Sequence, residues 1–313
     1  MWEKFRDVRT LGAIGVLAFI AIVGILNLTV YTPEATVLRY LSAIEDGRVV
    51  DAERIVWGDH VPDGVSVGLP ADSANRPHDF TVIGSARTAN VTTVDVSFTL
   101  GGQKVLTKFA MTEVPNWLPF RDWRFEIEPV ATVLQTGSAP IRLLINGVLP
   151  GKENLTLVPV LAEVGSGSPW FDATDVSVSA TTPEDVYLAD LKPTPTPALA
   201  EVLESSTRDY LDDCAAQKIL VPAECPFAGF TAMTVTAGPE WSIDTYPNLT
   251  VTSEDGEWVV KGDGKARLSV TLVDFATEKS EPYSELLLFT ISGTLTGLDS
   301  NTPRVVVSNT VEF

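Results

Sequence analysis

The sequence is poor in the residues from which catalytic and metal sites are most often built. Its 313 residues include two histidines, His60 and His78, and two cysteines, Cys214 and Cys225. The spacings HExxH, HxH and that of a calcium-binding EF-hand do not occur, and neither does a glycine-rich phosphate loop. The sequence therefore predicts no catalytic residue, no cofactor and no metal ligand.

One stretch nevertheless matches a catalytic pattern. Residues 64–68 read Gly-Val-Ser-Val-Gly, the G-x-S-x-G string that exposes a nucleophilic serine between a strand and a helix in hydrolases. Here a loop rich in proline and glycine surrounds Ser66, and Pro70 blocks an immediate helix. We interpret the motif as a chance match in a loop, with His78 as a solvated loop residue rather than a catalytic base.

Basic residues are in the minority. The chain has 22 Lys and Arg against 41 Asp and Glu, a formal net charge of −19. Such an excess keeps a protein soluble and disfavours nucleic acid as a partner.

Charge is absent from Thr10 to Pro33, and residues 11–30, LGAIGVLAFIAIVGILNLTV, are almost wholly apolar. Twenty residues at about 1.5 Å each span roughly 30 Å, the thickness of a bilayer's hydrocarbon core. A cleaved signal peptide, the alternative, has a shorter apolar region and a small-x-small cleavage site. We expect residues 10–31 to form a transmembrane helix that meets the lipid bilayer through residues 11–30.

The flanks of this helix predict its orientation. Lys4, Arg6 and Arg9 precede the helix, whereas the first basic residue after it is Arg39. Because positively charged flanks stay in the cytoplasm, residues 1–9 are expected inside the cell and the following domains outside the plasma membrane.

Residues 32–130 predict two helices followed by an antiparallel sheet. Thr32 and Pro33 form a helix-start signal, and Gly47 separates two stretches with helical spacing. Alternating stretches such as VDVSFTL and DWRFEI then predict strands, with a hairpin at Gly101-Gly102. This order indicates an α+β fold.

The helix-Gly-helix unit ATVLRYLSAIEDGRVVDAERIV and the strands after it resemble the nuclear transport factor 2-like (cystatin-like) cone fold. The resemblance covers about residues 33–130 and implies a helix-on-sheet domain that often encloses a pocket.

Residues 131–192 predict short strands separated by turns, which is typical of a small β-sandwich-like module. The proline-rich segment 193–197 then predicts a stiff extended linker. Residues 198–313 repeat the first pattern, a helix followed by strands, and predict a second cone-like domain. Asp255-Gly256 and Asp263-Gly264 are the expected hairpin turns of that domain.

The order of these parts behind one membrane helix resembles anchored envelope proteins of Gram-positive bacteria. It is distantly like the teicoplanin-resistance-associated type, and the loop ending in Cys225-Pro226-Phe227 resembles exported actinobacterial domains.

The cysteines are separated by ten residues, so they are not a redox C-x-x-C pair, and no histidine lies near them to complete a zinc site. An external location is oxidising and permits disulfides. We predict a Cys214–Cys225 disulfide that ties the helix at 198–218 to the first strand of the second domain.

The function predicted from these features is a non-enzymatic, single-pass envelope protein that presents interaction modules to an envelope protein or a wall polymer. Two alternatives remain open. The first is a cone domain that binds a small ligand or catalyses a reaction, and the second is an accessory subunit of a membrane complex. The oligomeric state is not predicted.

Overall fold

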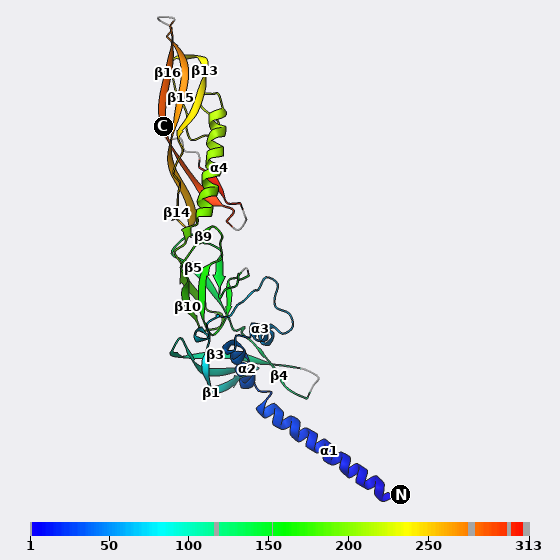
Figure 1. The fold of residues 1–313 in the computed structure, drawn as a ribbon. Coiled ribbons are helices and arrows are strands. Elements are labelled where there is room, and N and C mark those ends of the chain that lie inside the picture. Colours follow the sequence, from blue (N-terminus) through cyan, green and yellow to red (C-terminus); the bar gives the residue numbers. More distant parts are fainter. Residues whose placement is uncertain (1, 116–118, 152, 275–278, 299–301, 309–313) are drawn as a thin grey trace. The chain divides into compact units, whose positions relative to one another are not determined.

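The computed structural model describes residues 2–115, 119–151, 153–274, 279–298 and 302–308 (Figure 1). Its helices and mostly antiparallel sheets confirm the predicted α+β class. The chain divides into two compact units. The first comprises Met1–Leu134, Leu143–Gly165 and Asp175–Ala189, and the second comprises Gln135–Arg142, Ser166–Thr174 and Asp190–Phe313.

The chain begins with helix α1 (Trp2–Thr29). Among the described residues, no helix taken alone has both the length and the hydropathy needed to cross a membrane. The segment Val16–Thr29 meets the requirement only together with helix α2 (Pro33–Glu45), to which it is bent by 57°. The transmembrane helix over residues 10–31 therefore stays a prediction.

Helix α2 starts where its sequence signal predicts. The Thr32 side chain accepts a hydrogen bond from the Ala35 amide at 3.1 Å, and Pro33 occupies the first turn, where its missing N–H leaves no unpaired donor. Gly47, with φ of 71°, then turns the chain into helix α3 (Val49–Trp57). Both predicted helices are confirmed.

The first unit contains a four-stranded antiparallel sheet onto which α2 packs. Its strands, in spatial order, are β1 (His78–Thr88), β2 (Val91–Leu100), β3 (Gln103–Val114) and β4 (Asp122–Phe125). Gly101 and Gly102 both have positive φ and join paired residues Leu100 and Gln103, which confirms the predicted hairpin. A short 3₁₀ helix, Ser73–Asn75, precedes the sheet.

Two three-stranded sheets follow, mostly within the first unit. One has the order β10 (Val176–Ala180), β8 (Val160–Ser166), β6 (Leu143–Ile145), and the other the order β11 (Val186–Asp190), β5 (Val130–Thr136), β7 (Leu155–Leu157). These are the short strands predicted for residues 131–192.

The sequence places a domain boundary between residues 130 and 131, but most of the following module belongs to the first unit. Tyr40 of α2 is fully buried, and its hydroxyl donates to the Val158 carbonyl oxygen at 2.6 Å and lies 3.1 Å from that of Pro129. Thr107 of β3 donates to the Thr181 carbonyl oxygen at 2.7 Å. A buried hydroxyl needs an acceptor, and the β-module supplies it.

The proline-rich segment 193–197 is extended, as its composition predicts, but it is bonded to neighbouring chain. Strand β12 (Thr194–Pro195) pairs with β9 (Phe171–Asp172), as the edge position of such a short strand allows for a proline. Thr196 caps helix α4 (Pro197–Ala216) by accepting from the Leu199 amide at 3.3 Å.

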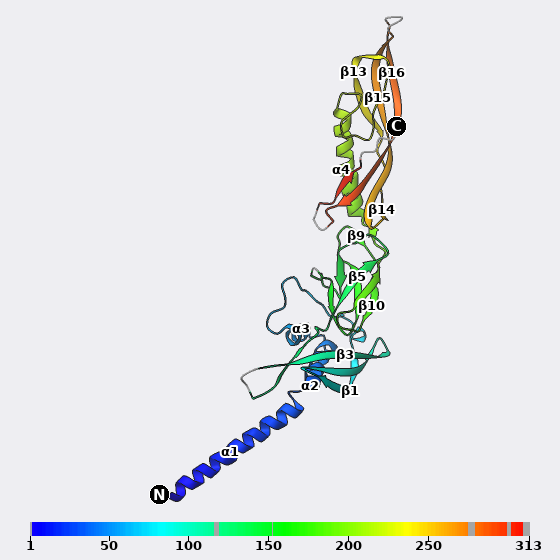
Figure 2. The ribbon, with the colours of Figure 1, turned by 180° about the vertical axis from the view of Figure 1, so that it is seen from behind.

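In the second unit, α4 runs along one face of a five-stranded antiparallel sheet (Figures 1 and 2). The main order is β13 (Thr234–Thr245), β15 (Glu257–Asp274), β16 (Lys279–Thr296) and β17 (Arg304–Val307), and β14 (Thr250–Glu254) also pairs with β15. The helix followed by a meander of strands is the pattern that the sequence predicts.

The prediction of two hairpin turns in this unit is right for one of them and wrong for the other. Asp255 and Gly256 form the turn between β14 and β15, with φ of 50° and 81°. Asp263 and Gly264 instead lie inside the continuous strand β15. Gly264 pairs with Phe289, and a Cβ added to this glycine would lie 2.3 Å from the ring atom Cζ of that phenylalanine. The glycine therefore makes room for an aromatic ring and does not reverse the chain.

Candidate functional site

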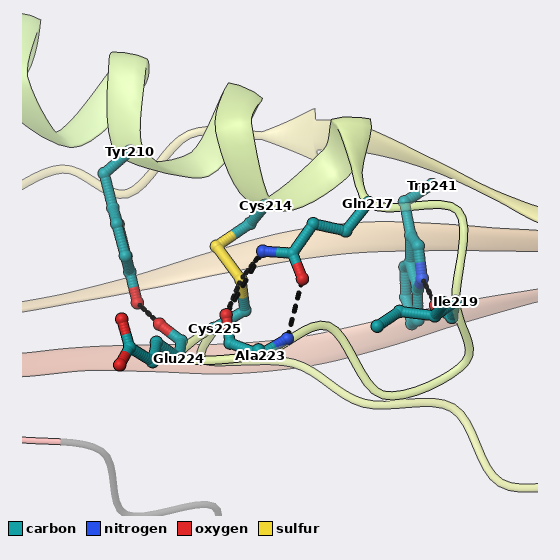
Figure 3. Close-up of a disulfide and its surroundings, with 8 residues drawn as sticks. All are labelled: Tyr210, Cys214, Gln217, Ile219, Ala223, Glu224, Cys225 and Trp241. Atoms are coloured by element: carbon teal, nitrogen blue, oxygen red, sulfur yellow. Dashed lines mark hydrogen bonds between the residues drawn. A yellow bond between two sulfur atoms is a disulfide. The ribbon is translucent and has the colours of Figure 1, made fainter.

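The two cysteines lie where α4 ends and the chain turns back toward the sheet (Figure 3). Cys214 is in the last turn of α4, and it forms a disulfide with Cys225, eleven positions later. The two residues are 2% and 5% exposed. The predicted disulfide is thereby confirmed, and it joins the end of α4 to the loop that leads to β13.

The side chain of Gln217, three residues after Cys214, also holds this loop in place. Its side-chain oxygen accepts from the Ala223 amide at 2.8 Å, and its side-chain nitrogen donates to the Ala223 carbonyl oxygen at 3.2 Å (Figure 3). A loop without regular structure has to find partners for its backbone groups elsewhere. Gln217 supplies two of them beside the disulfide.

The disulfide is part of a packed core. The ring of Phe227 lies 4.8 Å from that of Trp241 and 5.4 Å from that of Phe289. A Cβ added to Gly229 would lie 2.4 Å from Cδ2 of Leu268, so the loop backbone rests directly on the sheet. Thiol–disulfide exchange requires access of a thiolate to sulfur. Because Cys214 and Cys225 are buried, their sulfur atoms lack that access, which indicates a structural role for the disulfide.

Two tyrosines near this loop have raised pKa values. Burial, followed by the carboxylate of Glu224, raises the pKa of Tyr210, whose hydroxyl donates to the Glu224 carbonyl oxygen. The hydrogen bond from its hydroxyl to Asp212 is the main cause that raises the pKa of Tyr246, and Arg208 lies 4.2 Å from the centre of its ring. Both phenols therefore stay protonated at neutral pH, which is unsuited to a nucleophile or base.

The G-x-S-x-G motif lies in a segment that is neither helix nor strand, with Ser66 half-buried. The Asn146 side chain donates to the Gly68 carbonyl oxygen at 3.1 Å, and a Cβ on Gly151 would lie 1.5 Å from the Gly64 oxygen. The motif is thus packed backbone-to-backbone against residues 146–151. This differs from the strand-to-helix turn of a hydrolase.

The two histidines lie apart from any cluster of ligands. The Nδ1 atom of exposed His60 is 2.9 Å from the Asp59 carbonyl oxygen, and Nε2 of His78 is 3.9 Å from the Asp79 carboxylate. In the described part of the chain, no three His, Cys, Asp or Glu side chains are grouped so that they could hold a metal ion.

Packed side chains occupy much of the space between helix and sheet in both units, and in the second unit a hollow of about 300 Å³ remains between α4 and residues 246–248. In the first unit, the fully buried rings of Tyr40 and Phe109 meet edge to face with a centroid distance of 6.2 Å. In the second unit, Phe171 and Trp258 stack at 4.2 Å within a second core cluster around α4. A surface hollow of about 400 Å³ beside Tyr283 is lined mainly by small and polar residues of the sheet.

The tryptophans serve this packing. Trp123, Trp170, Trp241 and Trp258 are each between 5% and 9% exposed, so their rings pack in the cores and do not form an exposed stacking surface. Trp117 lies outside the described residues.

Sequence reasoning missed a contact at the end of α1. The side-chain nitrogen of Asn27 donates to the Pro119 carbonyl oxygen at 2.8 Å, and its oxygen accepts from the Arg121 amide at 2.8 Å. The available signal was an amide inside an otherwise apolar run, but nothing in the local sequence named its partner.

No family model, curated protein or solved structure matches this chain.

Proposed function

We propose that this chain is a single-pass membrane protein that presents non-enzymatic interaction modules on the outer side of the plasma membrane. The observation that carries the proposal is the exposed apolar surface of α1. Its side chains at seven positions are 56% to 78% exposed: Val16, Leu17, Phe19, Ile20, Ile22, Ile25 and Leu28. At about 100° per residue these positions point in every direction around the helix, and a helix that is apolar all round requires an apolar environment.

The orientation follows from charge and from the disulfide. Lys4, Arg6 and Arg9 stand before the apolar run, and positive flanks favour the cytoplasm. The Cys214–Cys225 disulfide suits an oxidising compartment outside. Both features support external domains.

The packed aromatic clusters between helix and sheet favour interaction through surfaces over chemistry in a pocket. The external residues expose an acidic and β-rich surface, so an envelope protein or a wall polymer is the partner class that we propose.

Topology is tested with the full chain in Gram-positive cells. In intact cells, external protease is expected to cleave the protein, and alkylation under denaturing conditions is expected to find no free thiol. Replacing Lys4, Arg6 and Arg9 by Glu should protect the protein and leave both thiols reduced. Replacing three exposed lysines after the helix, Lys104, Lys108 and Lys218, by Glu is the matched control and should change neither result. Protease protection and free thiols in the unaltered protein would contradict the proposal.

Interaction is tested with the full chain in phosphatidylcholine nanodiscs as bait for solubilised envelope fractions, with empty nanodiscs as the control. We expect retention of a specific protein or wall polymer that weakens as salt is raised, because the surface is acidic. Failure to retain any component at low and at high ionic strength would contradict the interaction role.

A further inference from the structure

The chain that leaves α1 is fastened to the turn that precedes β4. Both polar atoms of the Asn27 side chain bond to this turn, through the carbonyl oxygen of Pro119 and the amide of Arg121. Four residues later, the ring of Tyr31 stacks on that of Phe120 with a centroid distance of 4.8 Å. We call residues 119–121 the proximal turn.

A third bond lies just beyond the proximal turn. Nε1 of Trp123, the second residue of β4, donates to the Tyr31 carbonyl oxygen at 3.1 Å. The segment from Asn27 to Tyr31 is therefore held by three side chain–backbone hydrogen bonds and one ring stack, between residues about 90 positions apart in sequence. The proximal turn cannot leave the end of α1 unless these contacts break.

The sequence of α1 shows where along the apolar helix the contacts with the proximal turn lie. Residues 11–26 have no polar side chain, and Asn27 is the first amide after them. An unpaired amide in hydrocarbon is costly, but here the proximal turn pairs one of its two N–H groups and its oxygen. Apolar surface continues beyond it, because Leu28 is 78% and Val30 is 48% exposed. The proximal turn therefore lies beside the last apolar turn of the helix.

The residues around the fastening suit the boundary between lipid and water. Tyrosine and tryptophan are enriched at that boundary, and long basic side chains there reach toward water. Tyr31 and Phe120 are half-buried, Pro119 is exposed, and the Arg121 side chain is 50% exposed. The acidic excess of residues 33–130 is small, at 14 acidic against 9 basic side chains, which limits repulsion from a membrane surface.

We infer that the proximal turn is a second contact with the bilayer, in its interfacial layer, and that Asn27 is the positioning residue that holds it there. This inference rests on the proposed membrane anchor. With two points of contact, the first unit is restrained from turning freely about the axis of α1.

The depth of the proximal turn is measured by spin labelling of the full chain in phosphatidylcholine nanodiscs. Both native cysteines are in the disulfide, so each introduced cysteine is the single free thiol. Labels are placed by Pro119→Cys in the proximal turn, by Ile20→Cys in α1, and by Gln103→Cys at the opposite end of β3. Power-saturation electron paramagnetic resonance then compares collisions with oxygen, which partitions into lipid, and with a water-soluble nickel chelate.

We expect the ratio of oxygen collisions to nickel collisions to be highest at residue 20 and lowest at residue 103. The ratio at residue 119 should lie between them and be severalfold above that at residue 103. Equal ratios at 119 and 103, with a lipid value at 20, would overturn the inference and leave the anchor intact. An aqueous value at residue 20 would instead overturn the anchor of the proposed function.

The role of Asn27 is tested in the Pro119→Cys background with Asn27→Leu, which removes both hydrogen bonds and keeps the helix apolar. The ratio at residue 119 should fall severalfold toward that at 103, and the label should become more mobile. Asn248→Leu makes the same change at an exposed position of the second unit and should leave residue 119 unchanged. An unaltered ratio with Asn27→Leu would overturn the positioning role.

Discussion

Removing the disulfide, by Cys214→Ala together with Cys225→Ala, is expected to lower the free energy of unfolding of the second unit by about 3 kcal/mol. The sequence separation of 11 closes a loop of about 12 residues, and such a cross-link removes roughly 3 kcal/mol of chain entropy from the unfolded state at 25 °C. The paired bonds of Gln217 to Ala223 remain in the variant, so the fold of the loop should persist.

Calorimetry of the full chain measures this effect and uses the first unit as an internal reference. For a unit of about 140 residues, a loss of 3 kcal/mol corresponds to a fall in the melting temperature of roughly 10 °C. Only the transition of the second unit should move. In a urea titration, the m-value of that transition, the slope of its free energy of unfolding against urea concentration, should rise. The reason is that the unfolded chain without its cross-link exposes more surface.

The single variant Cys214→Ser separates the cross-link from the packing of the sulfur atoms. It breaks the same disulfide but changes one buried side chain, so it should lose nearly as much stability as the double variant. A double variant that loses twice as much as the single one would show that packing dominates. A shift below about 2 °C would refute the loop-closure reasoning altogether.

Gly264→Ala should cost about 1–3 kcal/mol, because its Cβ would meet the ring of Phe289, whereas Gly238→Ala, with no atom within 4 Å, should stay within about 0.5 kcal/mol in the same urea titration. Tyr40→Phe should cost about 1–3 kcal/mol by removing the hydroxyl that donates to the buried Val158 carbonyl oxygen, and the exposed Tyr283→Phe should be nearly neutral by the same measurement. Burial raises the pKa of Tyr40 well above 10, so its stabilising effect is present below about pH 10 and is lost as the pH rises further. Urea titrations between about pH 9 and pH 11 should show this alkaline loss in the native chain and a smaller one in Tyr40→Phe; equal slopes would contradict it.

Local signals in the sequence predicted the elements that depend on neighbouring residues. Thr32 and Pro33 start α2 because a capping hydroxyl and a preset φ act within one turn. Gly101 and Gly102 reverse the chain because both adopt positive φ. The disulfide was predictable because the chain contains two cysteines alone, so that a single pairing exists.

Features set by distant residues were not predictable in this way. Asp263-Gly264 has the composition of a turn, but both residues pair with β16 inside the continuous strand β15, and the partner of Gly264 is Phe289, 25 positions later. Tyr40 has the spacing of an ordinary core residue, and the bond that joins it to the β-module spans 118 positions. No pattern within a short window contains such partners, so the extent of the first unit and the partner of Asn27 were both missed.

Four neutral side-chain carboxamides each bond to the backbone of a loop or turn and help to hold it in place. Asn27, Gln135, Asn146 and Gln217 each donate to one backbone carbonyl oxygen and accept from one backbone amide, at distances between 2.8 and 3.2 Å. A carboxamide can do this because it carries a donor and an acceptor without a charge, so it bonds to loop backbone as a neighbouring strand would. A carboxylate in its place would lose the donor and set an oxygen against a carbonyl oxygen, and at buried Asn146 it would add the cost of burying a charge. In a urea titration, Asn146→Asp should therefore lower the free energy of unfolding more than Asn146→Ala, the reverse of what similarity of shape suggests. A search of the sequence for charged residues, histidine and cysteine does not identify these amides, although the proximal turn and the disulfide loop both depend on them.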